Sequence, residues 1–249
     1  MTELSIIIAT LKPREQIVCL RDLARQEFKD YEVIIRDDDR VTVARNEGIK
    51  RAQADKLVFL DDDSRPTEGY LNRVSTMLDE EAVVAGKIVH PRTDVIKEFT
   101  GHYAPAESAK YITRFWGCNM AARREVFDTV GGWDENITWG HEEKELAERV
   151  LHEYPIYYDP ELTVYHSYAD SVRDYWKKQY QLETQTPYLW EKSEMPAQRQ
   201  WLEIIRLGIN PINYIRLTPR QTVVQAGGEL ARTAGRIRGM LKKLDDQLL

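Results

Sequence analysis

The chain has 249 residues, of which 42% are hydrophobic and 31% charged, a composition typical of a soluble globular protein with a sizeable core. Its formal net charge of −6 argues against general nucleic-acid affinity, so we expect no nucleic-acid partner. Cys19 and Cys118 form neither a metal-spaced pair nor a disulfide framework, which favours a reducing compartment such as the cytoplasm. No segment is long and apolar enough to predict a signal peptide or a spanning helix.

The first 60 residues alternate between strand and helix patterns. β-Branched residues at 4–10 predict a strand, and a helical periodicity follows over 14–28. A second strand ends at Asp37, Asp38 and Asp39, a second helix covers 43–54, and a third strand covers 57–60. This alternation predicts an α/β fold with a mainly parallel sheet and helices on both faces. Ligands of such sheets bind beyond the carboxyl ends of the strands.

The third strand, LVFL, runs directly into Asp61, Asp62 and Asp63. Adjacent carboxylates repel one another, so a folded protein keeps them together mainly when a cation or several donors neutralise them. Strand side chains alternate between faces, and Asp61 and Asp63 are therefore expected to converge on one ion while Asp62 points away. The alternative is a solvated acidic turn.

The same alternation of strands and helices continues beyond Pro66, with an irregular stretch at 90–110. Near residue 170 the pattern changes to helices alone. The later predicted elements are a helix at 69–80, a strand at 82–89, a short strand within 115–122, a helix from about Arg123, a helix at 142–152 and a short strand at 163–168. Beyond that point helices rich in Tyr and Trp are expected. We predict a domain at 1–169 and a helical C-terminal appendage at 170–249.

Glu143 is a candidate general base on the predicted helix 142–152. Residues three, four and seven positions later are Leu146, Ala147 and Val150, which places Glu143 at the centre of the apolar stripe. Partial burial raises a carboxylate's pKa towards the range in which it accepts a proton well. The alternative is an ion pair with an Arg or Lys. Glu142 lies about 100° away around the helix and is expected to be solvated, to form hydrogen bonds or to contact an acceptor.

The order of eight segments along residues 4–167 resembles the family 2 glycosyltransferases, an inverting, DxD-containing family with the GT-A fold. The segments are SIIIAT, EVIIRDDD, VARNEGI, FLDDDS, WGCNMAARREVF, GGWDE, WGHEEKELAERV and VYHSY. Each segment alone is weak, but their order is specific. One departure is that VARN follows RDDDR almost at once, where the family has a longer segment.

The resemblance implies a metal site. Asp61 and Asp63 would hold a divalent cation, Mn²⁺ or Mg²⁺, that bridges the diphosphate of a nucleotide-sugar donor. His166 would complete the metal ligands, and an imidazole ligand leans towards Mn²⁺. The alternative is a histidine satisfied by local hydrogen bonds.

The resemblance also assigns the base to Glu143, and it implies a set of donor-binding residues. Asp38 would read the nucleobase with help from Asp37. The remaining predicted donor contacts are Thr10, Arg45, Asp61, Asp62, Trp116, Gly117 and Asn119. A helix-surface position is the commoner state of a single arginine such as Arg45. Trp133 and Trp139 could stack on sugars or belong to the core.

The expected activity is inverting transfer of a sugar from a nucleoside-diphosphate donor, expected to be a UDP-sugar, to an acceptor hydroxyl of a glycan or lipid-linked saccharide. A sugar nucleotidyltransferase is the first alternative, but it needs a Gly-rich phosphate loop after the first strand, and IIIATLKPREQ has no glycine. A non-catalytic nucleotide-sugar-binding protein is the second alternative.

The C-terminal helix, predicted at 220–247, carries an apolar seam surrounded by basic residues. The seam is formed by Leu230, Ala234, Ile237, Leu241, Leu244 and Leu248, and the basic residues are Arg232, Arg236, Arg238, Lys242 and Lys243. This pattern predicts peripheral contact with an anionic membrane, at the inner face of the cell membrane. The seam could instead pack on its own domain or pair with a second copy in a homodimer.

Overall fold

The structure, a computed structural model, describes residues 2–91, 99 and 103–248, with the backbone alone for 243–248. The chain divides into two compact units by its internal contacts. Unit 1 comprises Met1–Arg92, Thr100–Thr138 and Glu142–Ser167, and unit 2 comprises Thr93–Phe99, Trp139–His141 and Tyr168–Leu249.

Unit 1 is built on one sheet, whose strand order is β2-β1-β3-β7-β5-β8-β4, with β6 also paired to β8. Its strands are β1 (Leu4–Ala9), β2 (Tyr31–Arg36), β3 (Lys56–Phe59), β4 (Arg65–Pro66), β5 (Val83–Val89), β6 (Lys110–Ile112), β7 (Met120–Arg123) and β8 (Ile156–Tyr165). Parallel pairing joins β1 to β2 and β3, and β5 to β8, whereas β7 is antiparallel to both of its neighbours. The predicted α/β class is confirmed.

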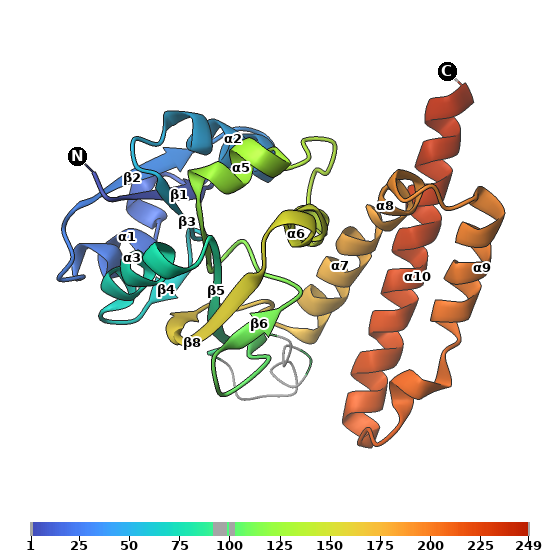
Figure 1. The fold of residues 1–249 in the computed structure, drawn as a ribbon. Coiled ribbons are helices and arrows are strands. Elements are labelled where there is room, and N and C mark those ends of the chain that lie inside the picture. Colours follow the sequence, from blue (N-terminus) through green and yellow to red (C-terminus); the bar gives the residue numbers. More distant parts are fainter. Residues whose placement is uncertain (1, 92–98, 100–102, 249) are drawn as a thin grey trace. The chain divides into compact units, whose positions relative to one another are not determined.

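Helices cover both faces of this sheet (Figure 1). They are the 3-10 turn η1 (Arg14–Gln16), α1 (Cys19–Ala24), α2 (Val41–Arg51), α3 (Tyr70–Glu80), α5 (Arg124–Val130) and α6 (Glu142–Glu153). Alternation along β1 sends Ile6 and Ile8 into one buried cluster with residues of α1 and α3. Ile7 enters a second cluster with residues of α5 and α6. Both faces of the sheet are therefore buried, as expected for β-branched strands without polar alternation.

Two predicted elements differ from the structure. The expected helix 14–28 is a 3-10 turn followed by the short α1, because Ile17 between them is extended (φ −79°, ψ 99°). The expected strand 163–168 is the end of the longer β8, which begins at Ile156. Pro160 interrupts the strand pattern in the sequence, so the first half of β8 was not predicted. The pairing of β8 with β5 shifts register at this point, where a residue without an N–H is tolerated. Most of the predicted irregular stretch 90–110 lies outside the described residues.

The strand registers bring three distant segments to one edge of the sheet. Phe59 on β3 pairs with Met120 on the antiparallel β7, so the residues after β3 lie opposite those before β7. Arg65 on β4 pairs with Tyr165 on β8, which places the end of β8 beside the same segment. The chain around Asp61, Cys118 and His166 therefore meets at the carboxyl end of β3.

Unit 2 is helical. It contains α7 (Val172–Glu183), α8 (Thr186–Lys192), α9 (Ala197–Gly208), the 3-10 turn η3 (Pro211–Tyr214) and α10 (Pro219–Leu248). Glycines let α10 approach α7 closely: a Cβ at Gly235 would lie 2.3 Å from the Tyr180 carbonyl oxygen, and one at Gly227 would lie 2.3 Å from the Trp176 ring. The Trp176 indole donates to the Val224 carbonyl at 2.9 Å. Within the described part of the chain, no helix is both long and apolar enough to cross a bilayer.

Candidate active site

A tight turn, rather than an extended strand, arranges the acidic residues after β3. The Ser64 backbone N–H donates to the Asp61 carbonyl at 3.0 Å, and the Asp61 N–H donates to the Ser64 hydroxyl at 3.1 Å. The same hydroxyl donates to the Cys118 carbonyl at 2.9 Å, which fixes the turn against the chain before β7. The predicted divergence of Asp62 from its neighbours is present, but its cause is this turn and not strand alternation.

Asp62 is held by the loop after β1. Its carboxylate accepts hydrogen bonds from the Thr10 hydroxyl and from the Lys12 ammonium, the latter at 2.6 Å. The hydrogen bond to Asp62 raises the pKa of Lys12. Thr10 and Asp62, both predicted to contact a donor, are therefore bonded to each other at the edge of the sheet. Lys12, which the sequence analysis did not single out, adds a partly exposed positive charge there.

His166, immediately after β8, lies against the acidic turn. Its Nε2 is 3.5 Å from Asp61 Oδ2 and 3.3 Å from Asp63 Oδ1, so the structure places the predicted histidine ligand next to both predicted carboxylate ligands. Burial alone lowers the pKa of His166, but Cys118 and the carboxylates of Asp63 and Asp61 raise it, to about 11. Burial raises the pKa of Asp63, but the hydrogen bond and charge of His166 outweigh it, so the net pKa of Asp63 is lowered.

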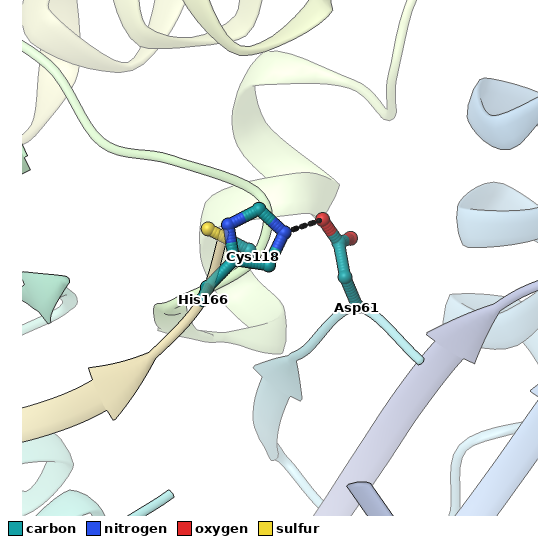
Figure 2. Close-up of side chains that lie close together, drawn as sticks. All are labelled: Asp61, Cys118 and His166. Carbon is teal, nitrogen blue, oxygen red and sulfur yellow. Dashed lines mark ion pairs between the residues drawn. The ribbon is translucent and has the colours of Figure 1, made fainter. Parts of the chain in front are cut away.

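Cys118 belongs to the same cluster, although the sequence did not predict it as a site residue. Its Sγ and ligand atoms of Asp61 and His166 all lie within 4.8 Å of one another. Figure 2 shows the His166 imidazole facing the Asp61 carboxylate, with the Cys118 sulfur towards the other side of the ring. Burial raises the pKa of the Cys118 thiol, although His166 opposes this. Only the register between β3 and β7 reveals this proximity, because the spacing of 57 residues carries no signal.

Arg45 is enclosed beneath this cluster. Only 4% exposed, it places Nη2 3.3 Å from Asp61 Oδ1 and Nη1 3.5 Å from Glu142 Oε1. Its guanidinium also lies over the Trp133 ring, 4.5 Å from the centroid. The alternative of a helix-surface arginine is wrong because Arg45 is buried, and its predicted contact with a diphosphate stays a prediction. The guanidinium lies between the partly exposed Asp61 carboxylate and the buried Glu142 carboxyl.

Glu142 and Glu143 differ from their predicted environments. Glu142, expected to lie off the core-facing stripe, is only 5% exposed, because it begins α6 and turns towards Arg45. Burial and the charge of Glu143 raise the pKa of Glu142 to about 8, although Arg45 lowers it. Glu143 is partly buried, and its Oε1 accepts a hydrogen bond from the Gly117 N–H at 3.3 Å. A buried acid and a more accessible carboxylate thus lie side by side.

Comparisons with known proteins identify the fold. The family described as the N-terminal domain of galactosyltransferase matches residues 103–156. The structure of S. aureus TarS 1-349 matches with a TM-score of 0.56 at 12% identity, covering 98% of this chain and 92% of that one. The chain has a GT-A fold. A search of curated proteins finds no match.

Two further structures that match this GT-A chain contain UDP. S. aureus TarS 1-349 in complex with UDP matches with a TM-score of 0.55 at 13% identity, over 98% of this chain and 92% of that one. GalNAc-T7 with UDP, GalNAc and Mn²⁺ matches with a TM-score of 0.53 at 13% identity, over 67% of this chain and 43% of that one. The predicted GT-A fold and the resemblance that carried it are confirmed.

Of the other predicted donor contacts, Asn119 requires a correction. It is 1% exposed, its amide donates to the carbonyls of Lys87 and Leu162, and its Oδ1 accepts from the Tyr70 hydroxyl. Because all of these partners belong to the protein and the side chain is buried, Asn119 joins strands of the GT-A sheet and is not exposed to a sugar hydroxyl. Its residue type and position in the motif gave no means of distinguishing the two roles.

The remaining predicted contacts stay predictions. The Asp38 carboxylate accepts two hydrogen bonds from Arg36, and these lower its pKa, while Asp37 is exposed. Trp116 is half-buried and packs edge-on against Tyr103, with ring centroids 5.9 Å apart. Trp133 is a core residue, whereas Trp139 is 39% exposed.

Gly117 is required by Arg45. A Cβ at this position would lie 2.2 Å from Arg45 Nη2 and 2.6 Å from Cζ, so Gly117→Ala must displace the guanidinium from Asp61. We expect the variant to lose about 1–3 kcal/mol of unfolding free energy, as overpacking of an enclosed site does. Urea unfolding measures this loss. An unchanged midpoint for Gly117→Ala would contradict this contact.

The raised pKa of Glu142 makes stability depend on pH. In the unfolded chain this carboxyl ionises at its ordinary pKa of 4.5, whereas in the folded chain it holds its proton to about pH 8. Its contribution to stability is therefore complete below pH 4.5 and is lost as pH rises through 8. Glu142→Gln lacks this proton equilibrium. We expect its stability relative to the wild type to rise between pH 5 and pH 8.5, on the order of 2 kcal/mol, in urea unfolding at each pH. A parallel pH dependence for both proteins would contradict the assignment.

Proposed function

We propose that this protein is an inverting glycosyltransferase that moves a sugar from a UDP-sugar to an acceptor hydroxyl. The observation that carries the proposal is the convergence of Asp61, Asp63 and His166 at the carboxyl end of β3, next to the Glu142–Glu143 pair. The matched structures that contain UDP support a uridine diphosphate as the nucleotide. We further propose a glycan or a lipid-linked saccharide as the acceptor.

The chemistry of the cluster fits a divalent cation. The His166 Nε2 lies within 3.5 Å of a carboxylate oxygen of both Asp61 and Asp63, and these two side chains are 34% and 44% exposed, so an ion can reach them. Oxygen ligands suit both Mg²⁺ and Mn²⁺, and the imidazole favours Mn²⁺. When bound, such an ion supplies Lewis-acid stabilisation of a departing diphosphate. Asp61, Asp63 and His166 would hold it, and Arg45 would keep Asp61 in place from beneath.

Glu143 is the proposed general base. Its partial exposure leaves the carboxylate accessible to an acceptor hydroxyl, while the hydrogen bond from the Gly117 N–H orients it. The acceptor oxygen would give its proton to Glu143 and attack the anomeric carbon in one displacement, which inverts its configuration. Glu142, buried against Arg45, would position that arginine. Asp38 and Asp37 would contact the nucleobase, and Thr10, Asp62, Trp116 and Gly117 would line the donor site.

A screen of UDP-sugars tests the function. Purified protein is incubated with each UDP-sugar and Mn²⁺, and UDP release by slow hydrolysis is measured with and without a chelator. We expect at least one donor to release UDP in a metal-dependent way and to raise the thermal midpoint. The anomeric configuration of the product, followed by NMR, then tests inversion. No metal-dependent release and no thermal shift with any donor would overturn the proposal.

A further inference from the structure

Unit 2 exposes many large apolar side chains along α9, η3 and α10. Between 37% and 74% of each of these side chains is exposed, which is unusual for apolar residues so close in sequence. They are Leu202, Ile205 and Ile209 in and after α9, Ile212 and Ile215 in and after η3, and Val223, Leu230, Ile237 and Leu241 in α10. We call these nine residues the apolar face.

The α9 and α10 members lie on the same side of the helical hairpin. In α9, Gly208 faces Thr233 of α10, and Leu202, Ile205 and Ile209 lie about 100° around the helix from that contact. In α10, Leu230 and Ile237 lie about 60° and 40° from Thr233, in the same rotational sense. Figure 1 shows the two helices running side by side in opposite directions. Because both helices are right-handed and they run antiparallel, rotations in the same sense from their mutual contact carry both stripes to one side.

The opposite side of α10 is already occupied by α7. Arg232 donates to the Gln179 side chain at 2.6 Å and to the Tyr175 hydroxyl at 2.8 Å, and Arg236 forms a buried bidentate ion pair with Glu183. The expectation that these two arginines surround the exposed seam is therefore wrong. The expectation that the seam packs on its own domain is also wrong for Leu230, Ala234, Ile237 and Leu241, which are all exposed. The side chains of Lys243, Leu244 and Leu248 lie outside the described residues.

The charge around the apolar face is basic. Residues 168–249 carry thirteen Lys and Arg against nine Asp and Glu, a formal charge of +4, whereas residues 1–167 carry −10. Arg216, Arg220, Arg238 and Lys242 are exposed in the loop before α10 and along it, beside the apolar residues. The ion pair between Arg206 and Glu203 flanks the α9 stripe. An apolar strip with a basic border complements an anionic lipid surface.

We propose that the apolar face seats unit 2 in the interface of an anionic membrane. Its apolar side chains enter the headgroup and acyl boundary, and Arg216, Arg220, Arg238 and Lys242 contact lipid phosphates. A second copy would bring the two basic borders together, which like charges disfavour. This proposal concerns unit 2 alone and does not depend on the proposed function.

Vesicle co-sedimentation of the full-length protein tests it. We expect binding to vesicles of phosphatidylcholine with 30% phosphatidylserine at low salt, weaker binding at 0.5 M salt, and little binding to phosphatidylcholine alone. Leu230→Asp/Ile205→Asp should abolish binding, and Arg238→Glu/Lys242→Glu should weaken it about tenfold or more. The matched control is Leu11→Asp/Tyr111→Asp, which introduces the same charges at exposed apolar positions of unit 1 and should bind as the wild type does.

Circular dichroism and the thermal midpoint establish that each variant is folded before sedimentation. No binding by the wild type, or equal binding by the wild type and the folded Leu230→Asp/Ile205→Asp variant, would overturn the proposal. Sedimentation velocity without lipid tests whether the apolar face instead binds a second copy of the chain. The proposal would also be overturned if the wild type did not bind vesicles and instead formed a dimer that persists at high salt and is lost in Leu230→Asp/Ile205→Asp.

Discussion

Glu143→Gln is expected to lower kcat about 100-fold or more while leaving donor binding nearly unchanged. Glutamine is almost isosteric with glutamate, and its carbonyl oxygen can still accept the hydrogen bond from the Gly117 N–H. The site's geometry should therefore survive, and only proton acceptance is lost. Steady-state kinetics with the donor found in the screen measures kcat, and calorimetry with UDP and Mn²⁺ measures donor binding.

Glu142→Gln is the matched control for this prediction. The two residues are adjacent on α6, but the raised pKa of Glu142 keeps it mostly protonated at pH 7, where a neutral amide resembles it. We expect its kcat at pH 7 to fall much less than that of Glu143→Gln. Turnover of Glu143→Gln close to the wild type, together with a large loss in Glu142→Gln, would move the role of base to Glu142.

Local sequence patterns predicted the α/β class because short apolar runs and turn residues alternate regularly. They did not predict the antiparallel pairing of β7 with β3 and β5, since a strand's direction depends on partners distant in sequence. The first half of β8 was missed because Pro160 interrupts its pattern, and the sheet tolerates this proline at a register shift. Element type could thus be predicted locally, whereas pairing could not.

The candidate site shows the same division. The Asp61–Asp63 cluster and His166 could be predicted from residue type and motif order. Adjacent acidic residues after a buried strand repel one another unless a cation or several donors neutralise them. The burial of Arg45 and Glu142 could not be anticipated, since it follows from a contact between two segments that are far apart in the sequence. Asn119 was predicted to contact the donor, whereas Cys118 was not predicted as a site residue, yet it is Cys118 that lies in the cluster with Asp61 and His166. The strand register decides which of these two neighbours meets the cluster, and no single segment of the sequence encodes that register.

Asp63→Ala is expected to abolish metal-dependent binding of UDP while leaving the fold intact. Asp63 lies in the turn after β3, and its side chain is 44% exposed and contacts His166 Nε2 at 3.3 Å, so its removal leaves no cavity in the core. With one of two carboxylates gone, the remaining Asp61 and His166 hold a divalent cation far more weakly. Calorimetric titration with UDP, with and without Mn²⁺, measures the loss, and the thermal midpoint checks the fold.

Asp128→Ala is the control for the loss of one negative charge, because Asp128 is an exposed aspartate on α5. That variant should retain the wild-type difference between UDP affinity with and without Mn²⁺, because Asp128 is not one of the proposed ligands of the ion. His166→Ala should fall between the two, since both carboxylates remain. If Asp63→Ala kept the full Mn²⁺ dependence, the ion would have to be held elsewhere, and the pairing of Asp63 with His166 would be an ordinary surface ion pair.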